Sequence, residues 1–483
     1  MSRHGKTMGA ALSVAMMGLI ILMSATGHGA GKKSRGGGAS LPPPLPPVRV
    51  TLPPVETHTA DNGLRLYYIK DELPQLTIVV SIGYGKLNEN KDNAGIAELL
   101  ARTLTLAGSK KYPGEKLSAA IERVGGRFTI QESWENTVIT IRVLERHSGL
   151  AYDILGDLVK NPNFDISYLN QARSLMDEKI RRRSDNPAEL AFVMLRKIIF
   201  GGDGYGAVAV ERSVASITLN DLAEVWKTRV KARNIMVGIA GSPDYDTVRK
   251  SILDTLGDLE PGVEAGYAVD RPKALAAVRS SRKKIYFIPR PIPQATIVVG
   301  TVAPDIRSPQ VYPLQVMDYI LGGGSFNSRL VKEIRVKRGL AYAVQSVVRF
   351  RRETGVFMAY AQTGNDQAHR SLSLMLDTIS SMATEQVSEE EMQWAKNAII
   401  NSYIFDFETP LEVLGRYLDT AYYGLPSTYL SSYTERIGAV SREETMKSGG
   451  ELLNHGLVCL VVGGEDVRKN LSALGEIVVL RPD

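Results

Sequence analysis

The sequence predicts an α+β fold with two homologous domains, each a mixed or antiparallel sheet with helices layered on one face. LPQLTIVV, beginning at Leu73, returns as IPQATIVV at Ile292, with six of eight residues identical. Two further pairs of blocks follow in the same order at a spacing of about 220 residues: NPAELAFVMLRKIIFGG with TPLEVLGRYLDTAYYGL, and NIMVGIAGSPDYDTVRK with GLVCLVVGGEDVRK. A unit of this length is a whole domain and not a solenoid repeat, so we interpret the pattern as an internal duplication.

The start of the chain is expected to lie outside both domains. Arg3 and Lys6 precede an apolar run over 8–23, and small residues follow. This is the pattern of a secretory signal, so residues 1–30 are predicted to be a signal peptide, with an uncleaved inner-membrane anchor as the alternative. The Gly- and Pro-rich stretch 31–54 is predicted to be a tether. Both readings place the protein in the periplasm or another extracytoplasmic space.

The first predicted domain, residues 55–260, reads as strand pairs followed by helices. GLRLYYIKDELPQLTIVVSIGYG is hairpin-like, a helical stretch follows, and GGRFTIQESWENTVITIRVL alternates like two strands. LERHSGLAYDILGDLVKNP and LNQARSLMDEKIRRRSD have apolar residues at helical spacing, and NIMVGIAG closes the domain as a strand. Strand pairs followed by runs of helices favour the α+β class.

A stretch containing Pro, Gly and Ala at 261–281 is the predicted inter-domain linker, and the second domain follows at 282–483. The single cysteine, Cys459, lies in GLVCLVVGG, which reads as a buried strand. It can form no internal disulfide and is expected to be a small core residue.

The charge does not indicate a nucleic-acid partner. The net charge is +6, but five Lys and Arg residues fall within the first 36 residues, where there is no acidic residue. The remainder of the chain is therefore close to neutral, and a basic patch is not expected.

The second domain carries a glycine-rich turn followed by a helix and a strand, ILGGGSFNSRLVKEIRVKRGLAYAVQSVVRF. Its glycines are predicted to form a flexible loop: Gly322, Gly323 and Gly324. Ser325, Asn327 or Ser328 is expected to cap the helix. Gly339 is expected to end the helix, and LAYAVQSVVRF continues as a strand.

The element order, the repeat and these motifs resemble the pitrilysin/insulinase-type zinc peptidases, over about residues 55 to 480. In active members of that family, a helix near the start carries H-x-x-E-H, and a second glutamate about 76 residues later completes the zinc site. Here GIAELLARTLTLAGS places Glu98 and Arg102 at the histidine positions and Ala101 at the catalytic glutamate. Glu178 falls at or next to the third ligand, with a solvent-facing helix glutamate as the alternative interpretation.

These replacements argue against zinc in this chain. A guanidinium stays protonated and has no lone pair to offer, and alanine cannot accept a proton. No two of the six histidines lie within five residues of each other, so no helix offers a pair one turn apart. We expect no cofactor in this chain and no peptidase activity of the chain alone.

The family's other signature is an arginine late in the helix followed seven residues later by a tyrosine. Arg335 and Tyr342 have this spacing. The resemblance implies that the pair donates hydrogen bonds to the scissile carbonyl, where negative charge develops during peptide hydrolysis. Arg338 is an alternative donor. The competing interpretation is that Arg335 pairs with a helix carboxylate such as Glu333 and that Tyr342 is a core residue of the strand.

Aromatic residues in FDFETPLEVLGRYLDTAYYGLP also resemble the family. We expect them to be core or chamber wall and not a cofactor site: Phe405, Phe407, Tyr417, Tyr422 and Tyr423. Glycines 322–324 are a weaker candidate for contact with an extended substrate, with a tight turn as the alternative.

In two-subunit members of the family, one chain carries zinc and the other carries the Arg/Tyr pair. The resemblance therefore implies the non-catalytic subunit of an exported heterodimeric zinc peptidase, with zinc in the partner and a peptide or unfolded protein as substrate. Two alternatives remain open: an inert scaffold of the same fold, and a homodimeric peptide-binding chamber without hydrolysis.

Overall fold

The computed structural model describes residues 51–264, 266 and 269–481. The predicted signal peptide and nearly all of the predicted tether lie outside these residues. In the described part of the chain, no helix has the length and apolar character needed to cross a bilayer.

The first sheet has six strands in the order β1-β2-β6-β3-β5-β4. Its strands are β1 Glu56–Thr59, β2 Arg65–Lys70, β3 Gln75–Ile82, β4 Arg127–Glu132, β5 Thr137–Leu144 and β6 Ile235–Gly241. Only the β2–β6 pair is parallel, with Tyr68 opposite Ile239. The sheet is therefore mixed, as expected.

The second sheet repeats this plan in the order β12-β7-β11-β8-β10-β9. Its strands are β7 Lys284–Pro289, β8 Gln294–Ala303, β9 Ala341–Arg349, β10 Gly355–Gly364, β11 Val458–Gly463 and β12 Glu476–Val479. The outermost strands differ. In the chain, β1 comes before the other strands of the first sheet and is antiparallel to β2, whereas β12 comes after the other strands of the second sheet and is parallel to β7. The α+β class with two similar sheets is confirmed.

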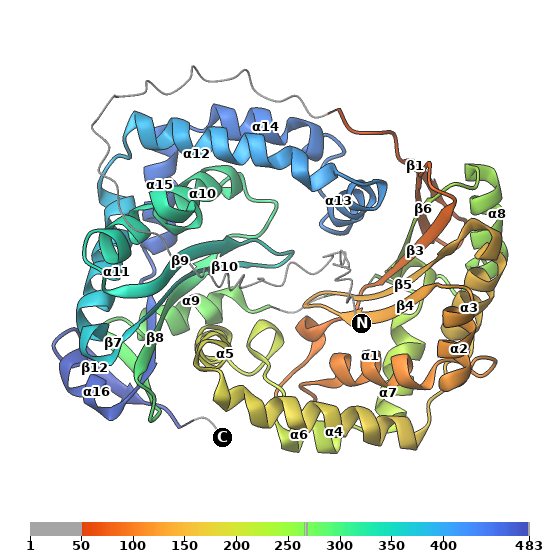
Figure 1. Ribbon diagram of the computed structural model, residues 1–483, viewed down its shortest axis with the longest axis horizontal. Coiled ribbons are helices and arrows are strands. Elements are labelled where there is room, and N and C mark those ends of the chain that lie inside the picture. Colours follow the sequence, from red (N-terminus) through yellow and green to blue (C-terminus); the bar gives the residue numbers. More distant parts are fainter. Residues whose placement is uncertain (1–50, 265, 267–268, 482–483) are drawn as a thin grey trace, which may run out of the picture.

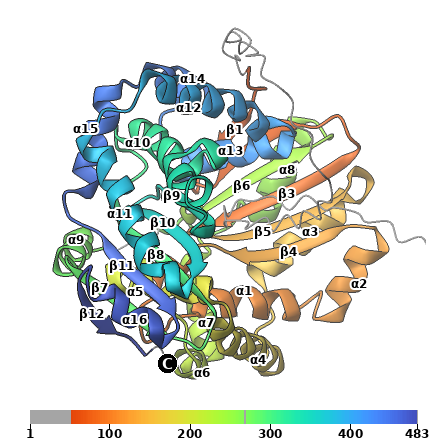
Figure 2. The same cartoon turned by 60° about the vertical axis from the view of Figure 1, so that its left-hand side comes forward.

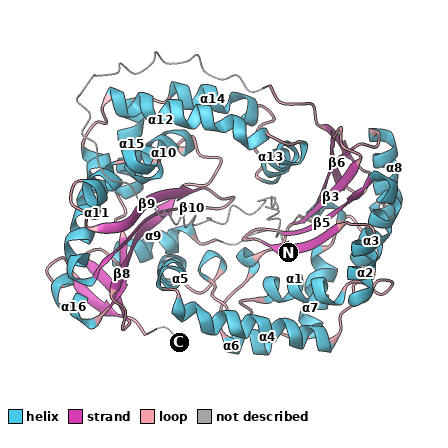
Figure 3. Ribbon diagram, in the orientation of Figure 1, coloured by secondary structure: helices cyan, strands magenta, loops and turns pink. Residues whose placement is uncertain are grey.

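Helices form most of the outer surface, and the strands lie inside them (Figure 3). The helices of the first part are α1 Ile96–Ala107, α2 Glu115–Arg123, α3 Ser148–Lys160, α4 Ile166–Arg182, α5 Pro187–Phe200, α6 Glu211–Ser216, α7 Leu219–Arg229 and α8 Tyr245–Leu256. Those of the second part are α9 Arg271–Ser280, α10 Val311–Asp318, α11 Ala368–Thr384, α12 Glu389–Ser402, α13 Pro410–Tyr422, α14 Tyr429–Ala439, α15 Arg442–Leu453 and α16 Glu465–Leu471.

Short helical turns join these elements. The 3₁₀ turns are η1 Lys86–Asn88, η2 Glu145–His147, η3 Arg183–Asp185, η4 Gly204–Gly206, η5 Ala232–Asn234, η7 Ser325–Asn327, η9 Asn365–Gln367 and η10 Tyr403–Phe407. Two segments are π-helical: η6 Tyr319–Gly323 and η8 Val331–Val336.

The three repeated blocks occupy equivalent elements. They correspond to β3 and β8, to α5 and α13, and to β6 and β11. β3 lies between β6, the closing strand of its unit, and β5, and β8 lies in the same way between β11 and β10. This equivalence supports the interpretation of a duplication.

One pairing expectation is wrong. The stretch read as a hairpin forms the strands β2 and β3, but β6 lies between them and bonds to both. The apolar pattern identifies each strand, but it carries no information on which neighbour a buried strand takes.

The helices α5 and α13 each cross to the sheet of the other half. In Figure 1 the two sheets lie on opposite sides of the molecule, and both helices lie between them. Leu190, Leu195 and Ile199 of α5 share a core with β8 and β11, whereas Val413 and Leu414 of α13 share one with β3 and β6. The turned view keeps α13 beside β6 (Figure 2). Each sheet thus has its own helices on one face and a helix from the other half on the opposite face.

Glycines allow this close approach. A Cβ on Gly238 of β6 would lie 2.7 Å from Leu418, and one on Gly300 of β8 would lie 2.9 Å from Leu195. A larger residue at either position would push the helix away from the sheet.

The segment predicted as a linker contains a helix. Within 261–281, α9 packs against α5 through Ala274 and Val278, which are buried in the same core. Asp270 accepts a hydrogen bond from the Lys273 amide and caps this helix. Pro272 lies at the second position of this helix, where proline is compatible with a helix start, so it does not indicate a loop here.

Candidate functional site

The region that resembles the zinc helix is built around one buried carboxylate. Glu98 lies on α1, and its side chain is only 7% exposed. Three cations reach it: Arg102 at 2.7 Å, Lys179 at 2.8 Å and Lys86 at 3.7 Å. Lys86 also pairs with Glu132 of the edge strand β4 at 3.2 Å.

These cations hold Glu98 ionised. Burial acts to raise the pKa of its carboxyl, but the charges of Lys86 and Lys179, with hydrogen bonds from Lys179 and Arg102, outweigh burial and lower the pKa to about 2. The cluster is therefore a salt-bridge network that joins η1, α1 and α4.

Glu178 lies outside this cluster. It is half exposed and pairs with Arg182 at 2.5 Å, one turn along α4. The next residue, Lys179, faces Glu98 instead. The solvent-facing interpretation of Glu178 describes its place. Neither Lys86 nor Lys179 was predicted from the sequence to lie at this site. A shift of one residue in the spacing from α1 would have identified Lys179.

The donor set does not fit zinc. Three ammonium or guanidinium groups surround one carboxylate, and cations repel a metal ion and offer it no lone pair. Ala101 is buried and brings no polar group. In the described ranges, no group of three or more His, Cys, Asp and Glu residues is placed to hold a metal ion.

The second candidate region is a helix, turn and strand in the other half. Lys337 N–H donates to the Lys332 carbonyl, the wide spacing of a π-helix, which recurs at functional sites. Gly339 has φ 61° and ends the helix as predicted. The strand β9 then begins at Ala341. The predicted caps are not used: no side chain caps η8, and the Ser328 hydroxyl donates to the Ser325 carbonyl.

Arg335 and Tyr342 lie close together on the surface. The Arg335 guanidinium carbon is 5.9 Å from the centroid of the Tyr342 ring and 5.2 Å from that of Phe326. Tyr342 is 69% exposed and Phe326 is 63% exposed. Two rings thus hold one guanidinium by cation–π contacts. The contact of Phe326 with Arg335 was not predicted, because nothing in the sequence marks Phe326 as a site residue.

The competing interpretation of this pair is wrong. Glu333 accepts from Lys337 and Arg338, at 2.5 and 2.6 Å, and not from Arg335. Tyr342 is not a core residue. Arg338 is engaged with Glu333, so it is a poorer donor to a ligand than Arg335, for which the described part of the chain provides no acidic partner.

Gly322 and Gly323 are helical, Gly324 follows the helix end, and all three are closely packed, so the expectation of a flexible loop is wrong. Gly322 and Gly323 end η6, and a Cβ on Gly322 would come closer than 3.0 Å to the Ser346 backbone nitrogen. Gly324 has the same conflict with Trp394. Substrate contact by these glycines stays a prediction, whereas their packing explains why the positions are glycine.

The downstream aromatic residues are mostly packed. Phe407, Tyr417 and Tyr422 lie against the core between α13 and the first sheet. Tyr423 donates to Glu135 at 3.1 Å. Phe405 is the exception, because it is 65% exposed. Cys459 is buried in β11, and burial raises its pKa to about 12, so it is a core residue as expected.

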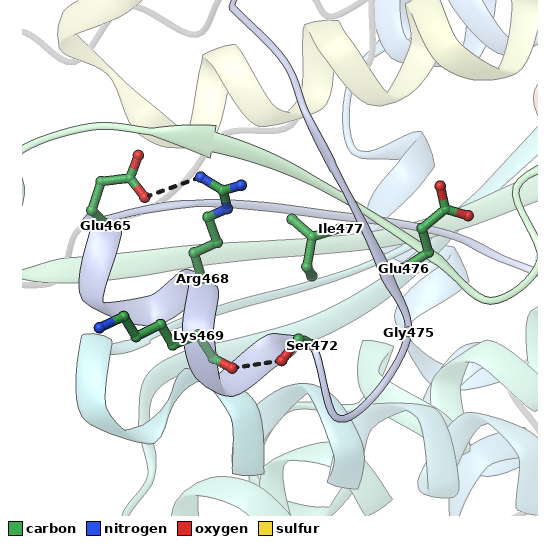
Figure 4. A pocket seen from close by; sticks show the side chains of 7 residues that line it. All are labelled: Glu465, Arg468, Lys469, Ser472, Gly475, Glu476 and Ile477. Atoms are coloured by element: carbon green, nitrogen blue, oxygen red, sulfur yellow. Dashed lines mark hydrogen bonds and ion pairs between the residues drawn. The ribbon is translucent and has the colours of Figure 1, made fainter.

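A surface hollow lies elsewhere, between α16 and β12 (Figure 4). It is lined by Glu465, Arg468, Lys469, Ser472, Gly475, Glu476 and Ile477. None of these is a predicted site residue, and Arg468 pairs with Glu465 at 3.9 Å. Arg335 and Tyr342 are not among the residues that line it.

Comparison with known families decides the relationship. Residues 66–210 match the family described as Insulinase (Peptidase family M16), and residues 216–399 match the Peptidase M16 inactive domain. Together the two matches cover more than half of the chain. The chain belongs to the M16 peptidase family.

M16 relatives resemble this chain over most of its length. An "Uncharacterized zinc protease YmxG" of Bacillus subtilis is 23% identical, over 75% of this chain and 87% of its own. A "Non-peptidase homolog YmxG" of Helicobacter pylori is 25% identical, over 80% of this chain and 89% of its own.

Solved structures share the M16 fold. A peptidase M16 inactive domain from Pseudomonas fluorescens superposes with a TM-score of 0.76 at 21% identity, covering 85% of this chain and 98% of that one. A protease from Helicobacter pylori gives 0.75 at 17%, covering 86% and 100%. This chain is therefore an M16 homologue whose described residues contain no cluster placed to hold a metal ion.

Proposed function

We propose that this chain is the zinc-free subunit of an exported heterodimeric M16 peptidase. It would bind a peptide substrate and contribute Arg335 and Tyr342 to the active site of a zinc-bearing partner. The export part of the proposal rests on the basic and apolar pattern of residues 1–30. The substrate would be a peptide or an unfolded segment of a protein.

One observation carries the proposal. Arg335 is exposed, has no carboxylate partner among the described residues and lies over the rings of Phe326 and Tyr342, while Lys337 and Arg338 are both engaged by Glu333. An unpaired guanidinium held between two rings keeps its N–H groups available to a ligand. A surface that served only as scaffold would not need donors held ready in this way.

The chemistry suits a carbonyl oxygen that gains negative charge. The Arg335 guanidinium and the Tyr342 hydroxyl are both hydrogen-bond donors. The rings of Phe326 and Tyr342 fix the guanidinium before a substrate arrives, so little reorganisation is needed when charge develops. Zinc would come from the partner, since the cations around Glu98 exclude it here.

The test is cleavage by the assembled pair. We expect Arg335→Ala and Tyr342→Phe each to lower kcat about 100-fold when this chain is co-expressed with a homologue that carries H-x-x-E-H, because each removes one donor to the oxyanion. Arg338→Ala is the matched control, and it should leave kcat within about twofold. Gel filtration shows whether the two chains still assemble.

Unchanged cleavage by an assembled pair carrying Arg335→Ala would refute the catalytic part and favour the inert scaffold. Chelator-sensitive cleavage by the purified chain alone would refute the division of roles between the two subunits.

A further inference from the structure

Two arginines between the halves of the molecule have no acidic partner among the residues that the structure describes. Arg196 lies on α5, and Arg351 lies in the connection between β9 and β10. Both side chains are partly buried. Both guanidinium groups contact aromatic rings, and neither forms an ion pair or a side-chain hydrogen bond with any residue that the structure describes.

The two arginines meet at one tryptophan. The guanidinium carbon of Arg196 is 4.9 Å from the centroid of the Trp134 ring, and that of Arg351 is 5.5 Å from it. Arg351 is also 5.7 Å from the ring of Tyr205, which packs edge-on against Trp134 at 5.9 Å. The rings therefore hold both guanidinium groups by cation–π contacts and leave their N–H edges without protein acceptors.

The local charge is unbalanced. Burial, followed by the positive charges of Arg351 and Arg183, lowers the pKa of Arg196 to about 10, and Glu189 opposes this only in part. Arg196 is still charged at neutral pH. A partly buried charge without a partner is costly, and an anion bound beside it would remove that cost.

The carboxylate next to Trp134 in the chain is already engaged. Glu135 accepts hydrogen bonds from the Tyr205 hydroxyl at 2.8 Å, from the Arg352 amide at 3.0 Å and from the Tyr423 hydroxyl at 3.1 Å. It ties the two halves together and forms no ion pair with Arg196 or Arg351 in the described part of the chain. An anion bound from outside the chain would give the two guanidinium groups a direct hydrogen-bond acceptor.

We propose that Arg196 and Arg351 bind a carboxylate group of a peptide held between the two halves. The inference rests on the proposed function for the nature of the ligand. A planar guanidinium matches a carboxylate with two parallel hydrogen bonds, and two guanidinium groups near one ring can share one carboxylate. Because α5 comes from the first half and the β9–β10 connection from the second, the ligand would contact both. A free C-terminus and an acidic side chain offer the same chemistry.

The experiment is calorimetric titration of the purified full chain with four peptides of one length and otherwise one sequence. One has a free C-terminus, one is amidated, one is amidated with an internal Glu, and one is amidated with Gln at that position. We expect one of the two carboxylate peptides to bind at least about tenfold more tightly than its neutral match, and Arg196→Gln or Arg351→Gln to abolish that difference.

Arg436→Gln is the matched control. Arg436 also lies over a tyrosine, with its guanidinium carbon 5.5 Å from the Tyr312 ring, but it belongs to α14. This variant should keep the full preference for the carboxylate peptide. Circular dichroism shows that each variant is folded.

Equal binding of the carboxylate and neutral peptides, binding of none of them, or a preference that survives both substitutions would overturn the inference. Binding of inorganic phosphate alone, with the same dependence on both arginines, would overturn the peptide as ligand. The inference and the proposed function can be distinguished by one variant. If both hold, Arg335→Ala should abolish cleavage with the partner and leave the preference for the carboxylate peptide unchanged.

Discussion

At the scale of single residues, one carboxylate is the centre of the salt-bridge network in the region that resembles the zinc helix. Glu98 is buried, while Lys86, Arg102 and Lys179 around it keep 29 to 44% of their side chains exposed. The cations can be hydrated, but the carboxylate cannot. Glu98 is therefore the member of the network whose removal should cost the most.

We expect Glu98→Gln to lower the free energy of unfolding by about 3 kcal/mol at pH 7, because three cations lose their buried counter-charge. Urea denaturation measures this difference. Glu178→Gln is the control, since its exposed pair with Arg182 should contribute less than about 1 kcal/mol. Equal effects of the two substitutions would contradict the assignment of Glu98 as the centre of the network.

The same residue gives a pH dependence with a definite sign. The pKa of Glu98 is lowered from 4.5 to about 2 in the folded chain. Its contribution is therefore complete above about pH 4.5 and is lost as the pH falls from there toward 2. The stability difference between the original chain and Glu98→Gln should shrink over that range, and should stay constant between pH 5 and 7.

At the scale of elements, the turn from η6 to β9 shows why a glycine-rich motif need not be flexible. Gly322 packs against Ser346, whose hydroxyl donates to the buried Asp318 at 2.6 Å. The π-helical segments on both sides widen the backbone, and the glycines let the β9 strand approach it. This packing fixes the position of the backbone that carries Arg335 and Tyr342.

We expect Gly322→Ala to lower the free energy of unfolding by about 1–3 kcal/mol, because the new methyl group meets the backbone nitrogen of Ser346 as well as its side chain. Thermal unfolding measures it. Gly415→Ala in α13 is the control: its Cβ would have no neighbour within 4 Å, so helix propensity should make it neutral or stabilising. A neutral Gly322→Ala would revive the interpretation as a flexible loop.

Several elements were predictable from the sequence, and others were not. The repeat located β3 and β8, and Gly339 marked the end of its helix, because these signals are local. The place of β6 between two strands and the approach of Lys86 to Glu98 depend on contacts between distant residues, which no periodicity encodes. Arg196 and Trp134 were missed for the same reason, since they are 62 positions apart in the chain.

At the scale of the whole molecule, the exchange of α5 and α13 makes each half depend on the other. Leu414 belongs to the second half, yet it packs under β6 of the first. The linker predicted at 261–281 therefore separates two sheets but not two independent packing units.

We expect Leu414→Ala to destabilise the chain by about 2–5 kcal/mol and to raise hydrogen exchange first in β2 and β6, because the cavity opens on the inner face of the first sheet. Mass spectrometry of peptic fragments resolves the two halves. Faster exchange confined to the helices of the second half would contradict the proposed coupling.

This exchange also affects the order of synthesis. All six strands of the first sheet have been made by Gly241, but the helix that covers their inner face begins at Pro410. At 5–20 residues per second, the ribosome needs roughly 10–30 s to make the intervening chain. During that interval the apolar inner face of the sheet has no covering helix, so the nascent protein should require a holding chaperone until α13 has emerged.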